Sequence, residues 1–248
     1  MRRLPVPRAD GEMEITTKTP NAQQMPLRLR ATSNVQCRGA YTLLELLVVI
    51  AIIGTLAAFA VTVLSGIQEK ARITQDMNNL RQIALATQTY LNDNDGAFFL
   101  PTGGASPWMN SLHPKYLSNW KIFQSPFDKR APSENNTTAP VSYGFNANAQ
   151  SSGVSLLSDK ITNPSTFILF APAQGTLTTV SFSGTAAASV TVDKASGSQG
   201  TALGGTHNNR KRINACMADL HVENTLWTVF INNTNSSSDP SASQRWTP

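Results

Sequence analysis

Four side chains near the C-terminal end are of types that bind metal ions, namely His207, Asp219, His221 and Glu223. If residues 219 to 223 are extended, the last three share one face of a strand and could converge with His207. Polar residues on the solvent-facing side of a β-hairpin give the same pattern, and turn chemistry is the simpler interpretation. The chain offers no acidic cluster with the spacing of calcium ligands. We therefore predict no cofactor and no catalytic centre, and these four residues remain weak metal candidates.

The basic balance of the chain is the second chemical feature. The formal net charge is +5 and the sequence pI is about 9.4, values that often indicate a nucleic-acid or membrane partner. Residues 1–40 contain seven basic and three acidic residues, whereas the other 208 residues have a net charge of only +1. The run Arg210-Lys211-Arg212 has no interleaved aromatic residues and is typical of a solvated loop. The charge pattern therefore predicts no nucleic-acid partner.

A single carboxylate, Glu45, lies in the apolar run Leu43 to Leu64. About 20 apolar residues in a helix span the hydrocarbon core of a bilayer, so the run predicts a transmembrane helix. Basic residues before the run outnumber those just after it, which predicts a cytoplasmic N-terminus. An ionised carboxylate near the start of such a helix normally has a partner. We expect Glu45 either to stay hydrated at the interface or to pair with a cation from another subunit.

The helical pattern continues past the apolar run. Residues 65–94 keep apolar side chains at helical spacing, and the charged residues lie mostly off that face. No proline occurs between Pro26 and Pro101, so the simplest interpretation is one helix from about Thr42 to about Asn94. The following Asn-Asp-Gly sequence is a typical helix end. We expect Leu80, Ala84 and Leu91 to pack under a sheet.

Residues 38–54, RGAYTLLELLVVIAIIG, resemble the N-terminal cleavage and methylation motif of type IV prepilins and type II secretion pseudopilins. This resemblance implies that a prepilin peptidase removes a basic leader and methylates the new terminal amine. It also implies that the glutamate at the fifth mature position neutralises the amine of a neighbouring subunit. Cleavage between Ala40 and Tyr41 makes Glu45 the fifth residue, whereas the alternative cut between Gly39 and Ala40 makes it the sixth.

The later sequence is similar to a bacterial subgroup of pseudopilin-like proteins with a C-terminal H-X9-DG motif. Here His207 and Asp219 enclose eleven residues and Leu220 replaces the glycine, which predicts a longer or differently shaped turn. Subgroup members often have Cys where this chain has Asp76, and Cys-Pro where it has Ser125-Pro126. With Cys37 in the leader, Cys216 is the only mature cysteine, so no intramolecular disulfide is expected.

The predicted fold class is α+β, with a long N-terminal helix packed against a small antiparallel β-sheet head, as in pilins. We expect a leader (1–40), a transmembrane half-helix (41–64), an amphipathic half-helix (65–94), a head (95–231) and a disordered polar tail (232–248). The start codon is Met1, Met13 or Met25. Gln174 to Thr206 is rich in small residues and predicts a surface insertion. Predicted strands cover residues 167–170, 180–182, 190–192, 214–217 and 227–231.

Two functions follow from these features. The first is a structural subunit of a type II secretion pseudopilus or type IV pilus-like filament, a homo- or hetero-oligomer with other pilin-like subunits. Its partners would be the prepilin peptidase and an inner-membrane assembly platform, with the head periplasmic or extracellular and the helix a single pass through the inner membrane. The second is a membrane-anchored exterior binding or metal-binding domain that does not assemble.

Overall fold

The computed structural model describes residues 41–99, 107–151, 154–175, 179–193 and 203–248. The expected leader lies outside these residues. The described residues fall into two units that divide after Ile50, and the long helix α1 (Leu43–Asp93) begins in the first and continues through the second. Its bounds agree with the expected helix. At its end Gly96 donates its backbone N–H to the Leu91 carbonyl at 2.8 Å, and Asp95 and Gly96 adopt φ of 51° and 76°. This is the left-handed helix end that the Asn-Asp-Gly sequence predicts.

The head contains a five-stranded sheet in the order β5-β1-β4-β6-β7. Its strands are β1 (Tyr143–Asn146), β4 (Ile168–Pro172), β5 (Thr191–Val192), β6 (Arg212–Met217) and β7 (Val222–Leu226). Neighbouring strands are antiparallel except β1 and β5, which are parallel. The sheet is therefore mixed, and the expectation of a purely antiparallel sheet is corrected. The parallel edge strand comes from the expected insertion, where Val190 and Val192 are buried.

Short elements complete the head. They are the helices α2 (Trp108–Leu112) and α3 (Trp227–Ile231), the two-stranded hairpin of β2 (Gln150–Ser151) and β3 (Val154–Ser155), and four 3-10 turns, η1 (Trp120–Phe123), η2 (Ala147–Ala149), η3 (Ser158–Lys160) and η4 (Ser243–Arg245). Residues 180–182, expected to form a strand, are irregular.

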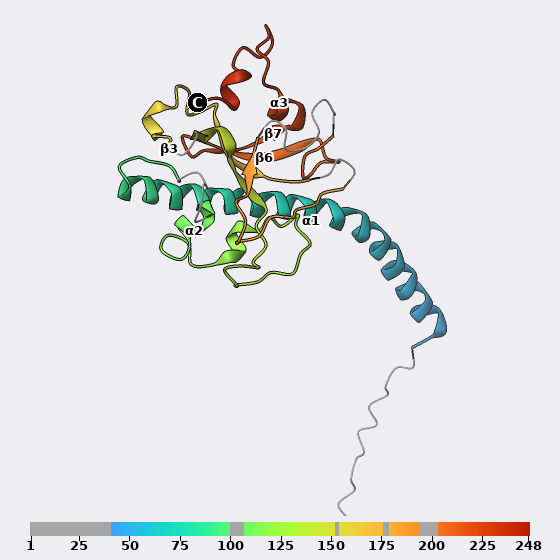
Figure 1. The fold of residues 1–248 in the computed structure, drawn as a ribbon. Helices are drawn as coiled ribbons and strands as arrows, with labels where there is room; N and C mark the ends of the chain where they lie inside the picture. Colours follow the sequence, from blue (N-terminus) through green and yellow to red (C-terminus); the bar gives the residue numbers. More distant parts are fainter. Residues whose placement is uncertain (1–40, 100–106, 152–153, 176–178, 194–202) are drawn as a thin grey trace, which may run out of the picture. The chain divides into compact units, whose positions relative to one another are not determined.

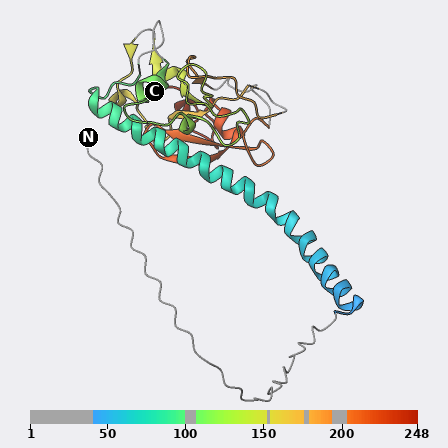
Figure 2. The same ribbon diagram turned by 90° about the horizontal axis from the view of Figure 1, so that it is seen from below.

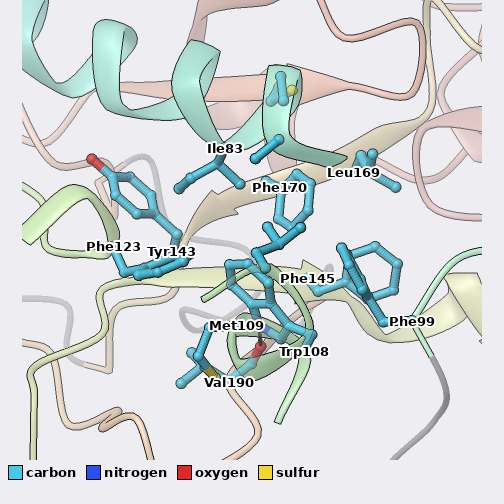
Figure 3. Close-up of a cluster of buried hydrophobic side chains, with 14 of the residues drawn as sticks. Ile83, Phe99, Trp108, Met109, Phe123, Tyr143, Phe145, Leu169, Phe170 and Val190 are labelled. Carbon is cyan, nitrogen blue, oxygen red and sulfur yellow. Dashed lines mark hydrogen bonds between the residues drawn. The ribbon is translucent and has the colours of Figure 1, made fainter. Parts of the chain in front are cut away.

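The sheet separates two apolar layers. One face packs on α1, which runs along the sheet in both views (Figures 1 and 2). Leu80, Ala84 and Leu91 are buried there as expected. Figure 3 shows Ile83 of α1 and Phe170 of β4 in this cluster, together with Trp108 of α2. The rings of Trp108 and Phe170 have centroids 5.0 Å apart, so a single aromatic core joins α1, the sheet and α2.

The other face of the sheet is covered by α3 and the C-terminal segment. Trp227 and Phe230 of α3 and Trp246 of the tail pack on Ile213 and other sheet residues. Residues 227–231 were expected to form a strand, but they form a helix because the large rings lie three positions apart and a helix places both on one side.

The tail, residues 232–248, was expected to be disordered. Instead Trp246 is 1% exposed, its indole N–H donates to the Phe230 carbonyl at 3.0 Å, and Arg245 binds Asp239 through two 2.7 Å contacts. Serine and asparagine dominate its composition, but one tryptophan at its end supplies enough apolar area to fix it against the exposed face of the sheet.

A buried carboxylate joins α1 to the head. Asp76 was expected off the buried face of α1, yet its exposed fraction is 0%. One carboxylate oxygen accepts hydrogen bonds from the hydroxyls of Ser125 at 2.5 Å and Tyr143 at 2.7 Å, and the other accepts from the Asn214 amide at 2.7 Å. These donors come from three segments, so Asp76 fixes the position of α1 against a loop, β1 and β6. Burial raises the pKa of Asp76, and the three hydrogen bonds oppose that rise.

The structure also brings the two positions of the subgroup cysteines together, because Asp76 and Ser125 share a hydrogen bond. In this chain an Asp–Ser contact occupies the two positions for which the sequence resemblance implies cysteines. Cys216 is buried in β6 without a disulfide partner among the described residues. Burial raises the pKa of its thiol, which keeps it protonated. Cys37 lies outside the described residues.

The tail packing predicts the effect of Trp246→Ala. Removing a fully buried ring leaves a cavity against α3, so the free energy of unfolding should fall by about 3–5 kcal/mol. Urea unfolding of the full chain in neutral detergent, followed by tryptophan fluorescence, measures this loss. Thr247→Ala is the matched control at an exposed neighbour and should stay within about 0.5 kcal/mol of the wild type. Equal unfolding midpoints for Trp246→Ala and wild type would contradict the packing of the tail.

The Asp76 network predicts a pH dependence of stability. Because the pKa of Asp76 is raised in the folded state above its usual value of 3.8, its favourable contribution is complete below pH 3.8 and is lost as the pH rises through the folded-state pKa. The unfolding free energy of wild type should therefore fall relative to that of Asp76→Asn as the pH rises above about 4. The exposed Asp95→Asn should follow the wild-type curve. Parallel curves for wild type and Asp76→Asn would refute the assignment.

Candidate functional site

The start of α1 holds the residues that the sequence connects with processing and assembly. Tyr41 is described and 88% exposed, while Gly39 and Ala40 lie outside the described residues. The Thr42 backbone N–H donates to Glu45 Oε2 at 2.9 Å, and the Glu45 backbone N–H donates to Thr42 Oγ1 at 3.2 Å. This reciprocal pair is a capping box, which satisfies two N–H groups that a helix start leaves free.

The capping box was missed by the sequence analysis, although its signal is present as Thr-Leu-Leu-Glu at residues 42–45. It explains how Glu45 is held in a single chain, because the carboxylate lies at the positive end of the helix dipole. Only Oε2 is used in this contact. Among the described residues, Glu45 Oε1 has no hydrogen-bond partner, so it can accept one from outside the chain.

The apolar segment around Glu45 packs against no other part of the chain that the structure describes. Leu43–Ala60 has a mean hydropathy of 2.6 and none of it is buried. At about 1.5 Å per residue, these 18 residues are about 27 Å long, close to the thickness of a hydrocarbon core. By length and composition the helix can cross a membrane, and its apolar side chains face outward on every side.

The four weak metal candidates are not brought together. His207 pairs with Arg212 at the start of β6, whereas Asp219 lies in the turn at the far end of the β6–β7 hairpin. His221 Nδ1 lies 2.5 Å from Asp219 Oδ1, and Glu223 pairs with Ala215 along the strand. No group of three potential ligands is close enough to hold a metal in the described part of the chain. The described residues therefore do not show the convergence that an extended 219–223 segment could have allowed.

The turn itself differs from expectation in one respect. Leu220 adopts φ of 70°, which is the left-handed conformation that glycine favours. The turn therefore keeps this conformation although leucine stands at the position of the expected glycine. Such a conformation costs about 1–2 kcal/mol. The Met217 N–H to His221 carbonyl bond at 2.9 Å closes the turn, and the Leu220 side chain packs against the core, which offsets that cost.

His207 has a structural environment. It is 3% exposed, its ring stacks on Phe127 at 5.5 Å, and Nδ1 lies 3.0 Å from the Thr206 hydroxyl. The Asn224 amide donates to Nε2 and also to Asn214 Oδ1, and Asn214 in turn binds Asp76. Burial lowers the pKa of His207 and keeps the ring neutral. His207 therefore belongs to the polar network that also holds α1.

Comparison with family models matches residues 36–61 to the prokaryotic N-terminal methylation motif. Comparisons with curated proteins and with solved structures gave no match. The matched segment contains both possible cleavage sites, Glu45 and the first part of α1, and it ends before the head. The subgroup resemblance of the C-terminal region therefore stays a prediction. The α+β layout of the head, with one long helix against a small sheet, agrees with a pilin-like protein. The N-terminal segment of the chain thus carries the prokaryotic N-terminal methylation motif, which is consistent with the prepilin and pseudopilin family.

Proposed function

We propose that this chain is a structural subunit of a type II secretion pseudopilus or type IV pilus-like filament, and not an enzyme. The observation that carries the proposal is an α1 start that is apolar on all sides, is not covered by any other described residues and holds one carboxylate at its first turn. In a membrane the bilayer covers this surface. In a filament the same surface packs against the α1 helices of neighbouring subunits, beside a peptidase-processed N-terminus.

The geometry of Glu45 gives the assembly contact a defined acceptor. Cleavage between Ala40 and Tyr41 creates a terminal amine four residues before Glu45. With Oε2 held by Thr42, Oε1 is the oxygen that an incoming ammonium group can bind. In an apolar surrounding the attraction between ammonium and carboxylate offsets the cost of removing both charges from water, whereas either charge left there without its partner is strongly destabilising. The contact therefore selects subunits in the correct axial position.

Topology follows from the charge distribution. The basic residues before α1 favour the cytoplasmic side, so the head lies in the periplasm or outside the cell. The inner-membrane assembly platform would then receive the subunit from the bilayer, and the other subunits would be pilin-like proteins, either copies of this chain or relatives.

Intact-mass analysis of the protein from its own membranes tests the processing step. We expect a mass that begins at N-methylated Tyr41 and lacks residues 1–40. A mass beginning at Ala40 would select the alternative bond. A mature protein that retains the leader would refute filament assembly by this route.

Substitutions of Glu45 separate its two roles. Glu45→Gln keeps a side chain that can complete the capping box but removes the charge, whereas Glu45→Ala removes both. Both variants should enter the membrane and be processed, and both should be depleted from sheared filaments by about 100-fold or more, since the partner amine is left unpaired. Quantitative mass spectrometry of the sheared and membrane fractions measures this ratio. Asp159→Asn, on the exposed η3 turn of the head, is the control and should assemble normally. Normal incorporation of Glu45→Gln would show that the charge is not used.

A further inference from the structure

A cleft of about 310 Å³ lies between α1 and the loop that leads into β6. Its α1 side includes Glu69 and Lys70, and its other side includes His207 and Arg212. The loop is fixed to α1 because the Asn208 N–H donates to Glu69 Oε1 at 2.7 Å. Asn208, Asn209 and Arg210 have φ of 51°, 51° and 65°, so a left-handed turn projects the basic run beside the helix.

Two cations in the cleft have unused donors. The Lys70 ammonium makes no hydrogen bond or ion pair among the described residues. Arg212 Nε donates to the side-chain oxygen of Asn224, and Arg212 Nη2 donates to the backbone carbonyl of Asn224 at 2.7 Å. Arg212 Nη1 has no hydrogen-bond partner in the described part of the chain. The only carboxylate of the cleft, Glu69, accepts the Asn208 N–H, and His207 accepts from Asn224. The cleft therefore offers N–H donors and positive charge to an anion.

The surrounding charge is strongly asymmetric. Residues 66–73 and 207–212 contain five basic residues and one acidic residue. The rest of the sequence from residue 41 onward contains eight basic and eleven acidic residues. The near-neutral mature chain is thus a positive patch beside α1 combined with an acidic remainder, and the partner of this patch is an anion.

The position of the cleft along α1 defines which anion it meets. The apolar run of the sequence ends at Leu64, and Lys70 follows six residues later, about 9 Å further along the helix. The headgroup layer on each side of a bilayer is about 5–8 Å thick. A lysine side chain can reach back to this layer. Lys70 and Arg212 therefore lie at the level of lipid phosphates when α1 spans the membrane.

We propose that this cleft binds the headgroup phosphate of an anionic phospholipid, with phosphate oxygens accepting hydrogen bonds from Lys70 Nζ and Arg212 Nη1. The proposal rests on the membrane anchoring in the proposed function. It adds a specific lipid contact by which the unassembled subunit is held at the bilayer surface with its head in a fixed orientation. The contact is lost when α1 leaves the bilayer for the filament.

Short-chain lipids test the site on the full chain. In zwitterionic detergent micelles, which cover the anchor, dioctanoylphosphatidylglycerol should bind more tightly than dioctanoylphosphatidylcholine by isothermal titration calorimetry. Lys70→Gln with Lys211→Gln removes two exposed charges of the patch and should weaken the anionic lipid by about 30-fold. The zwitterionic phosphatidylcholine, whose choline balances the phosphate charge, should lose much less affinity. The matched double variant Lys121→Gln with Lys160→Gln, both exposed and outside the patch, should bind as wild type.

The outcomes separate the lipid site from the anchor. Equal affinity for the two lipids would refute the proposed binding site in the cleft. An unchanged affinity for the anionic lipid in the Lys70–Lys211 variant would refute it as well. If inorganic phosphate at the same concentration displaced the anionic lipid, the cleft would be a site for a free anion, and the proposal of a lipid ligand would be refuted. Flotation of the full chain with purely neutral vesicles tests the anchor alone, so its failure would count against the proposed function and not against the lipid preference.

Discussion

The structure depends on where the first half of α1 can be placed. Leu43–Ala60 carries eleven large apolar side chains and none of the segment is buried. At roughly 2 kcal/mol for each side chain, leaving them in water costs on the order of 20 kcal/mol, which exceeds the usual stability of a whole domain. The chain therefore needs a bilayer or other apolar helices at all times. Every other feature of α1 is compatible with this requirement, including the absence of charges after Glu45 until Glu69.

The second half of α1 has a different task, because it has to hold the head in one position. Apolar contacts such as those of Leu80 and Ile83 are non-directional, and they alone tolerate a shift of the helix along the sheet. The buried Asp76 does not tolerate it, since a shift would leave the Tyr143 hydroxyl and the Asn214 amide unpaired in the core. The network continues through Asn224 to His207 and Arg212. The network therefore links α1 directly to β1 and β6, and through Asn214 to β7.

The parts of this fold that the sequence predicts are those with long or repeated patterns. The bounds of α1, its capped end and the burial of Leu80, Ala84 and Leu91 follow from periodicity over many residues. Short apolar segments were less informative, because residues 227–231 fit a strand or a helix until the partner of Trp227 is known. The same applies to Trp246, whose burial depends on an uncovered sheet face far away in the sequence. Asp76 was grouped with the charged residues that lie mostly off the apolar face, because a lone carboxylate shows nothing of its donors, which come from positions 49, 67 and 138 residues away.

The candidate site was predictable in its residues but not in its geometry. Residues 38–54 were enough to identify Glu45, whereas the capping box depends on both Thr42 and Glu45 having the right rotamers. This geometry bears on how the proposed filament would grow. If Glu45 paired with the terminal amine of its own chain, both charges would be neutralised within one subunit. No ion pair would then hold the next subunit in position. With the amine of one subunit on Glu45 of its neighbour, each added subunit leaves one charge of each sign for the next contacts. Such a head-to-tail contact produces an open helical filament whenever the rotation between neighbouring subunits does not close a ring.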